Sequence, residues 1–405
     1  MKKILLLGGS KQQIPAIECA KRKGYCTVLC DYLPDNPGQK FVDKFYLEST
    51  TDKDAILKIA QKEKIDGIVA YASDPAAPTA AYVAEQLGLP TNPYKAVEIL
   101  GNKGLFRKFL KENNFNVPTA KDYIDKDEII DDIKKNIYNF PIMIKPVDSS
   151  GSKGITKLLN EDNLEKSIDF AFKFSKSKRV IVEEYIENKN KFMVGGDCFV
   201  VNGQVKFWGL LNCHRDIKVN PLVPVGKSYP LLLTSKEKIE IQKEIQRVMS
   251  LLDINFGGFN IEVIIGKNNK IYLIEIGPRN GGNMIPDLLK IIYGVDMIDL
   301  TVEGAIGNNL IDLDYKESSS FYATHNIHSN KNGILKEIIF SKQLKEKIIK
   351  SIIYKNEGDT IEYFDNASKA LGILFLKFSS YEEMKAILNK INNLITIIVE
   401  EKVNK

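Results

Sequence analysis

The sequence predicts a protein of mixed α/β and α+β class, with a Rossmann-like unit at the N-terminus, a larger α+β unit and a small C-terminal α+β unit. Three observations lead to this prediction. Strand-like apolar runs alternate with helical patterns over residues 1–92, which is typical of a parallel sheet covered by helices. From about residue 119, strands and helices mix without strict alternation. A shorter α+β pattern begins near residue 321.

The composition is that of an ordinary globular protein. The chain has 405 residues, of which 44% are hydrophobic and 27% charged, so two or three domains are expected. The net charge of +5 comes from 57 basic and 52 acidic residues spread along the chain, which does not indicate a nucleic-acid partner. We expect no signal peptide, no membrane helix and reduced cysteines in a cytoplasmic protein.

The first unit shows three strands and three helices in turn. The strands are expected at residues 3–7, 26–30 and 67–70, and the helices at residues 15–23, 55–62 and 79–87. In such sheets, ligands bind beyond the carboxyl ends of the strands. Ser73 and Asp74 follow the third strand, so both are substrate candidates.

The proline-containing segment at residues 89–93 is a predicted domain boundary. Beyond it, apolar residues at helical spacing predict one helix over residues 94–113. We expect the second unit to span residues 93–318 and the third to span residues 319–405. In the third unit, strands are expected at residues 373–378 and 396–399, on either side of a helix at residues 381–391.

Two glutamates face each other in a predicted hairpin. Residues 259–265 and 270–276 are β-branched, apolar runs separated by a short polar turn. If the turn centres on Asn268 and Asn269, Glu262 lies directly opposite Glu275, about 5 Å away between Cβ atoms, where like charges repel. A divalent cation would remove the repulsion, and Mg²⁺ prefers oxygen ligands. The alternative is a pair of glutamates on a solvated face.

A glycine- and serine-rich loop follows a strand that ends in a lysine. The strand covers residues 141–146 and contains Lys145, and the loop reads Asp-Ser-Ser-Gly-Ser-Lys-Gly over residues 148–154. Backbone N–H groups of small residues can close around phosphate oxygens, although a flexible turn is the alternative. Residues 155–158 return as a strand, so we expect one mobile flap. The later strand Val-Glu-Glu-Tyr-Ile, residues 182–186, could receive a purine edge or be an ordinary edge strand.

The order of these motifs resembles the ATP-grasp superfamily. Lys103, Lys145, the glycine loop, the Val-Glu-Glu-Tyr-Ile strand, the paired glutamates and Arg279 follow one another over nearly the whole chain. The resemblance is to the carboxylate–amine ligase type, near biotin carboxylase and the carbamoyl-phosphate synthase large subunit. It implies a pre-ATP-grasp domain at residues 1–92 and an ATP-grasp domain at 93–318 with a mobile lid at about 119–187. A C-terminal domain would follow at residues 319–405.

The resemblance also implies ATP and Mg²⁺ as cofactors, with Mn²⁺ as a substitute, and it assigns roles to individual residues. Arg279 and Lys145 would be catalytic, Arg279 by stabilising the transferring phosphoryl group. Glu262 and Glu275 would hold the metal. The nucleotide would be bound by Lys103, Lys145, Ser149, Ser150, Gly151, Ser152, Gly154, Glu183, Glu184, Tyr185 and Ile186, the last four forming the hinge for adenine.

Two positions depart from the family pattern. Many members have an asparagine that helps to bind metal where this chain has Gly277. Asn260, Asn280, Asn283 or water could replace it. The acid that usually contacts the ribose is also unclear, because Lys191 occupies the nearest matching position and Asp197 follows a Gly-Gly pair.

Members that resemble this chain mostly activate a carboxylate as an acyl phosphate, so we expect a ligase that joins a small-molecule carboxylate to an amine. The alternatives are carboxyphosphate chemistry with bicarbonate, a small-molecule kinase, and a nucleotide-binding module without turnover. A homodimer is an open option, since relatives are often dimers. The substrate candidates are polar or glycine-rich positions near strand ends: Ser73, Asp74, His214, Arg215, Lys227, Asn280, Gly281, Gly282 and Asn283.

Overall fold

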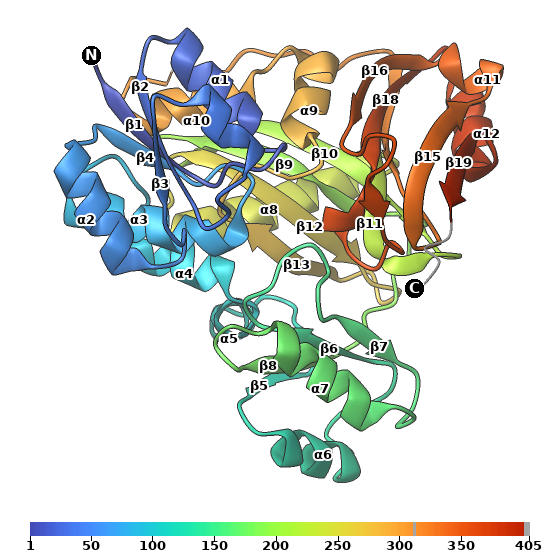
Figure 1. Cartoon of the computed structure of the whole chain (residues 1–405). Helices are drawn as coiled ribbons and strands as arrows, with labels where there is room; N and C mark the ends of the chain where they lie inside the picture. Colours follow the sequence, from blue (N-terminus) through green and yellow to red (C-terminus); the bar gives the residue numbers. More distant parts are fainter. Residues whose placement is uncertain (311–312, 401–405) are drawn as a thin grey trace, which may run out of the picture.

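The computed structural model describes residues 1–310 and 313–400. Its centre is an eight-stranded sheet with the strand order β13-β12-β9-β10-β11-β14-β18-β16. A four-stranded parallel sheet belongs to the N-terminal unit, and a three-stranded sheet lies near the C-terminus. A second four-stranded sheet lies in the segment expected to be a lid, residues 119–187, which is called the lid below. Figure 1 shows the N-terminal unit and the C-terminal strands at opposite ends of the central sheet, with the lid projecting below.

The N-terminal unit is a parallel sheet with helices on both faces, as the sequence predicts. Its strands are β1 (Lys3–Leu7), β2 (Cys26–Asp31), β3 (Lys44–Leu47) and β4 (Gly67–Val69), in the order β3-β2-β1-β4. Its helices are α1 (Ile14–Arg22), α2 (Lys53–Glu63) and α3 (Ala77–Gln86). The sequence analysis missed β3, because this edge strand has only four residues and is partly exposed.

Alternation along β1 explains how the units are joined. Ile4 and Leu6 share a core with α1 and with Val302 of α10 (Met297–Ala305), whereas Leu5 and Leu7 pack on the other face with α2 and α3. A helix of the second unit therefore covers one face of the first sheet.

The predicted helix over residues 94–113 is two helices, α4 (Tyr94–Gly101) and α5 (Lys103–Glu112). Asn102 separates them in an extended conformation, with φ −125° and ψ 117°. Its side chain accepts a hydrogen bond from Leu105 N at 3.1 Å, which caps α5. The break places Lys103 at the first position of a helix.

The lid has its own sheet and core. Its strands β5 (Ala120–Tyr123), β6 (Ile142–Pro146), β7 (Thr156–Leu158) and β8 (Val180–Glu184) are ordered β5-β8-β6-β7, and all neighbours are antiparallel. Helices α6 (Lys126–Lys134) and α7 (Leu164–Phe174) pack against this sheet. The lid therefore shares no strand ladder with the central sheet.

The central sheet begins with β9 (Met193–Val201), β10 (Gln204–Asp216) and β11 (Asn220–Tyr229) and includes β12 (Gly257–Ile265) and β13 (Ile271–Gly277). Helix α8 (Ser235–Leu251) covers one face and α9 (Ile285–Tyr293) the other, since Val200 packs in the first core and the adjacent Val201 in the second. Each face of the sheet is thus fixed by one helix.

The C-terminal strands β14 (Phe321–Ile327), β18 (Gly372–Phe378) and β16 (Ile348–Ile353) continue the central sheet beyond β11. The smaller sheet is formed by β15 (Gly333–Phe340), β17 (Thr360–Ile361) and β19 (Ile395–Glu400), with α11 (Lys342–Lys345) and α12 (Tyr381–Asn389) nearby. The central sheet thus crosses the boundary expected at residues 318/319. The predicted domain limits stay predictions, and the expected last residues, 401–405, lie outside the described range.

Candidate functional site

Glu262 of β12 and Glu275 of β13 pair directly across the hairpin, which confirms the predicted register. The turn itself differs from the expectation. Ile265 pairs with Ile271, so the ladder beside the turn would place Glu262 opposite Ile274. A β-bulge between Glu262 and the next residue adds one position on β13 and brings Glu275 across from Glu262. The bulge therefore sets the geometry of the two carboxylates.

The surroundings of Glu275 disfavour its charged form, because the cations nearby do not offset burial and the neighbouring carboxylates. Burial, followed by the neighbouring carboxylates of Asp74 and Glu262, raises its pKa, although Lys103 and Arg279 oppose the rise. Lys103 Nζ is 3.9 Å from Glu275 Oε1, and the Glu275 side chain keeps 30% of its surface exposed. This carboxylate is thus open to an incoming cation.

Lys103 joins the helix start to the glycine loop. Its backbone N–H donates to Val147 O at 2.9 Å, and its Nζ donates to Ser149 O at 2.7 Å. Because it is the first residue of α5, its ammonium adds to the positive end of the helix dipole. A phosphate beside it would meet both charges.

The glycine loop contains three residues with positive φ: Gly151 (66°), Ser152 (64°) and Gly154 (74°). Ser149 Oγ donates to Lys153 O at 2.9 Å and Lys153 N to Ser150 O at 3.5 Å, which closes a tight turn. The tip of the loop contacts the rest of the molecule through two further hydrogen bonds: Ala367 N donates to Gly151 O at 3.2 Å and Ser152 Oγ to Leu222 O at 3.0 Å.

Two glycines of this loop make a matched pair of test positions. A Cβ on Gly154 would lie 2.7 Å from Pro146 Cγ and 2.8 Å from Phe174 Cβ, whereas a Cβ on Gly151 would meet only Ala367 Cβ, at 3.6 Å. Both positions have positive φ, so alanine costs roughly 1 kcal/mol at either one. We expect Gly154→Ala to weaken ATP binding about tenfold more than Gly151→Ala, as measured by calorimetric titration. Equal losses would mean that the loop shape does not depend on this close packing.

Glu183 of β8 is a buried anion held by two cations. Its Oε2 is 2.5 Å from Lys145 Nζ and its Oε1 is 2.8 Å from Arg107 Nε, with Glu183 only 3% exposed. Burial alone would raise the pKa of Glu183, but Arg107 and Lys145 outweigh it and lower the pKa to about 2. The carboxylate is therefore charged at neutral pH and fixes the ammonium of Lys145.

The other hinge residues are held mainly by lid contacts. Glu184 N donates to Thr119 O and Tyr185 N to Pro141 O, both within 2.9 Å. The Glu184 carboxylate accepts from Asn139 N at 2.9 Å, so this side chain is held by a residue of the lid. These bonds do not use the Glu184 carbonyl or the Ile186 N–H.

Arg279 is paired with a residue of the N-terminal unit. Its Nη2 forms an ion pair with Asp74 Oδ2, and its Nη1 donates to Asn280 O at 3.1 Å. A Cβ on Gly277 would lie 2.8 Å from Asp74 Oδ1 and 3.3 Å from Arg279 Cζ. The glycine that departs from the family pattern therefore leaves room for this ion pair. Ser73 lies beside it, immediately before the short helix at Asp74–Ala76.

The turn after Arg279 is held by Asp197 and by Gln12. Gly281 N donates to Asp197 Oδ2 at 2.7 Å, and Asn260 Nδ2 donates to Asp197 Oδ1 at 2.9 Å. Burial raises the pKa of Asp197 to about 6, against the opposing effect of these hydrogen bonds. Asp197 is fully buried, so it supports the turn in this arrangement and does not face a ribose.

The other residues of the turn, Asn280, Gly282 and Asn283, contact different parts of the protein. Asn283 N donates to Gln12 Oε1 at 2.8 Å, and a Cβ on Gly282 would lie 3.1 Å from the same oxygen. Asn280 is 1% exposed and its Oδ1 accepts from Thr301 Oγ1 at 2.9 Å. The side-chain amide of Asn260 and the side-chain oxygen of Asn280 are thus engaged with protein groups, whereas Asn283 is held through its backbone N–H.

Lys227 lies on the face of the sheet that carries Glu262, whereas His214 does not. A Cβ on Gly195 would collide with Lys227 Nζ, and Gly195 pairs with Glu262 on the adjacent strand. His214 is one position along from the residue that pairs with Lys227, so strand alternation turns it to the opposite face. There it bonds to Ser228 Oγ at 2.8 Å, and burial lowers its pKa to about 4.

Arg215 lies at the bulge that follows His214 and donates to Leu222 O at 2.6 Å. Leu222 O is the same carbonyl that accepts from Ser152 of the glycine loop. The structure therefore brings Arg215 to the tip of the loop and leaves His214 among buried groups.

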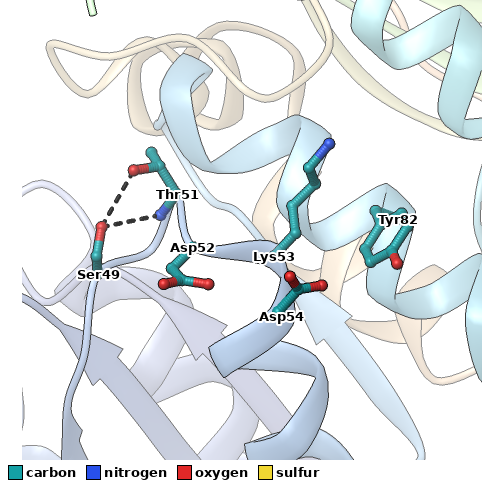
Figure 2. A pocket seen from close by; sticks show the side chains of 6 residues that line it. All are labelled: Ser49, Thr51, Asp52, Lys53, Asp54 and Tyr82. Atoms are coloured by element: carbon teal, nitrogen blue, oxygen red, sulfur yellow. Dashed lines mark hydrogen bonds between the residues drawn. The ribbon is translucent and has the colours of Figure 1, made fainter.

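A separate hollow lies at the N-terminus of α2 (Figure 2), and none of its lining residues belongs to the glutamate hairpin. Four of its six lining side chains already have protein partners: Ser49 Oγ and Thr51 Oγ1 are 3.1 Å apart, Asp52 caps Ala55 N at 3.0 Å, and Lys53 Nζ donates to Tyr94 OH at 2.8 Å. Asp54 and Tyr82 complete the lining. We therefore place the functional site at the hairpin and not here.

Arg107 is the site residue that the sequence analysis missed. It lies four positions after Lys103 on α5, hence on the same helix face. This spacing of four residues from Lys103 was the feature of the sequence that could have indicated Arg107. The guanidinium reaches both Glu183 of the lid and backbone carbonyls of β13.

Residues 100–283, which include the lid, the glycine loop and both glutamates, match the family model of the ATP-grasp domain. This part of the chain is therefore similar to an ATP-grasp domain, as the order of its motifs suggested. The chain is also similar to the carbamoyl phosphate synthase large chain. The protein from Caldanaerobacter subterraneus subsp. tengcongensis is 24% identical over 314 residues, which cover 75% of this chain but 28% of that protein.

Solved structures are similar over almost the whole chain. The L-amino acid ligase from Bacillus licheniformis has a TM-score of 0.80 and 20% identity, covering 99% of each chain. The biotin carboxylase domain of Hydrogenobacter thermophilus 2-oxoglutarate carboxylase, solved with MgADP and bicarbonate, has a TM-score of 0.74 and 17% identity, covering 98% of this chain and 91% of that one. These similarities confirm the predicted fold class.

Proposed function

We propose that this protein is an ATP-dependent ligase that activates a small-molecule carboxylate as an acyl phosphate and joins it to an amine, with release of ADP and phosphate. The observation that carries the proposal is the direct pairing of Glu262 and Glu275, with Lys103 beside Glu275 and bonded to the glycine loop. Positioning and charge neutralisation are the main requirements of phosphoryl transfer. These groups supply both without a protein nucleophile.

The phosphates of ATP would be held by Lys103, Lys145 and the loop at residues 149–154. Both lysines are fixed by protein acceptors, Ser149 O and Glu183, and each ammonium has further N–H donors for phosphate oxygens. The positive φ values of the loop turn its backbone sharply, as in anion-binding nests. The Glu184 carbonyl and the Ile186 N–H would receive the adenine edge.

Mg²⁺ fits between Glu262 and Glu275, with Mn²⁺ as a substitute. The raised pKa of Glu275 marks a carboxylate that a cation would stabilise. Among the described residues, no three His, Cys, Asp or Glu side chains converge to hold a metal. That agrees with a Mg²⁺ ion bound by one or two carboxylates together with nucleotide phosphates. When bound, the ion would supply charge neutralisation at the phosphate oxygens.

Arg279 would stabilise the transferring phosphoryl group through its planar fork. Asp74 holds one nitrogen of this guanidinium and the backbone of Asn280 holds another. A side chain fixed at two points loses little freedom when the reacting groups arrive. Lys145, fixed by Glu183, is the second proposed catalytic group.

The function is tested by ADP and phosphate release from Mg-ATP with pooled carboxylic acids, with and without pooled amines, using Glu275→Ala as the inactive control. Bicarbonate is included as a separate acid. Release that needs both an acid and an amine, and that the variant lacks, supports the ligase. Release with an acid alone points to a kinase, and release with bicarbonate alone to carboxyphosphate chemistry. ATP binding without any turnover would overturn the proposal in favour of a binding module.

Lys227 is proposed to bind the acid substrate or a phosphate, because this lysine is only 5% exposed and its ammonium lies on the face that carries Glu262. We expect Lys227→Met to raise the KM for the acid about 10- to 100-fold, since a charge-assisted hydrogen bond is lost. The exposed Lys238, which pairs with Glu317, provides a matched control as Lys238→Met. An unchanged KM for the acid would remove Lys227 from the substrate site.

The remaining expectations about partners are also proposals. The substrates would be a small-molecule carboxylate and an amine, and a homodimer is the proposed assembly, which light scattering can test. Among the described residues, no helix has the length and apolar character needed to cross a bilayer. A cytoplasmic location and the absence of a nucleic-acid partner stay predictions from composition.

A further inference from the structure

We propose that Arg107 is the positioning residue that sets the register of Glu262 and Glu275 and links it to the lid. This inference rests on the proposed function, because it assigns a metal ion to the two glutamates. It starts from the bulge in β13. Without that extra residue, Glu262 would face Ile274 and the two carboxylates would not be opposite each other.

The bulge needs partners for its backbone. An extra residue in one strand locally interrupts the ladder, so the carbonyl groups around it must find other donors. Arg107 supplies two of these donors: Nη1 donates to Leu273 O at 3.0 Å and Nη2 donates to Ile274 O at 2.7 Å. These two carbonyls belong to the bulged residue and to the residue beside it. Arg107 therefore binds the irregularity that aligns Glu275.

The third nitrogen of the same guanidinium faces the lid. Nε is 2.8 Å from Glu183 Oε1, and Glu183 also holds Lys145. Arg107 is 5% exposed, so these contacts are sheltered from water. The planar guanidinium can donate to the two carbonyls while its charge pairs with the carboxylate, whereas a lysine ammonium cannot reproduce this fork.

The position of Arg107 on α5 completes the link. Lys103 begins this helix and bonds to the glycine loop, and Arg107 follows one turn later on the same face. One short helix thus carries both Lys103, which contacts the glycine loop, and Arg107, which contacts the glutamate hairpin. A shift of α5 would displace both together.

Two variants distinguish the paired N–H donors of the Arg107 guanidinium, the fork, from its positive charge. Arg107→Met removes the fork but leaves the Lys145–Glu183 ion pair intact, so no buried charge loses its last partner. Arg107→Lys keeps a cation near Glu183 without the fork. We expect both to weaken Mn²⁺ binding in the presence of ADP about 10- to 100-fold, which is typical when a group that orients metal ligands is lost. Mn²⁺ is measured by electron paramagnetic resonance. Arg179→Met, which removes an exposed ion pair with Asp122, is the control.

The exposed pair gives the decisive contrast, because Arg179→Met removes an ion pair of the lid and keeps the fork of Arg107 on the bulge. Its Mn²⁺ affinity should stay within about threefold of the wild type. Wild-type affinity in Arg107→Lys, or an equal loss in Arg179→Met, would overturn the inference. A purely structural role would lower the melting temperature and leave Mn²⁺ affinity unchanged, which also overturns it. Failure of the wild type to bind Mn²⁺ with ADP would instead count against the proposed function.

Discussion

Glu275→Gln is expected to lower ADP formation about 10³-fold and, in the absence of metal, to raise the melting temperature. The loss of turnover follows from losing a proposed ligand of the cation that neutralises the phosphates, since roughly 4 kcal/mol of transition-state stabilisation corresponds to this factor. The gain in stability follows from the raised pKa of Glu275, which burial and the carboxylates of Asp74 and Glu262 cause. The same substitution thus has opposite effects on activity and on metal-free stability.

The sign follows from proton linkage. The folded pKa of Glu275 lies above its ordinary value of 4.5, so the folded state binds the proton more tightly than the unfolded state. Stability of the metal-free protein therefore falls as pH rises from 4.5 through the folded pKa. Glutamine removes that fall, and Mg²⁺ should stabilise only the wild type. Melting curves at pH 7 with and without Mg²⁺ test this, with Glu187→Gln at an exposed ion pair as the control. A lower metal-free melting temperature in Glu275→Gln would contradict the prediction.

Glu183→Gln is expected to destabilise the lid by about 3–5 kcal/mol, because it leaves Lys145 and Arg107 as buried cations without their shared anion. Hydrogen exchange of β6 and β8 measures the loss where it arises. Glu165→Gln, which affects an exposed ion pair with Lys126 in the same lid, is the control. Unchanged protection of β6 and β8 would show that the ion pairs do not hold the lid together.

The pH dependence provides a second measurement on Glu183. Its pKa is lowered from 4.5 to about 2, so its ion pairs stabilise the folded state above pH 4.5. This contribution, of the order of 3 kcal/mol, is lost as pH falls towards 2. The wild-type lid should therefore lose protection in this range, and the Gln variant should lose less.

Much of the candidate site could be proposed from the sequence because its motifs are local in sequence. The glycine loop, Lys145 and the Val-Glu-Glu-Tyr-Ile strand could each be recognised from adjacent residues, and the parallel N-terminal sheet followed from alternating patterns. The opposition of Glu262 and Glu275 was also predicted. However, it depends on a bulge that compensates for a turn centred one position from the expected one. Pattern analysis counts residues between strands and does not see an extra residue inside one.

The parts that were missed are contacts between distant segments. The ion pair of Asp74 with Arg279 spans two units, and the Arg107 contacts join α5 to both the lid and β13. The helix expected over residues 94–113 is interrupted at Asn102. The interruption was missed because a single extended residue leaves the helical spacing of the apolar residues almost unchanged. Such features depend on tertiary packing, which overrides local propensity.

The continuity of the central sheet limits where this protein can be cut. Strand β11 pairs with β14 from Gly226 to Tyr229, across the expected boundary between the second and third units. A truncated chain that ends before β14 would present unpaired backbone groups of β11 to solvent, and an exposed strand edge invites aggregation. A chimera that exchanges the C-terminal segment for that of another protein must therefore bring a strand that fits this edge. The C-terminal part is in this sense built into the central sheet and not appended to it.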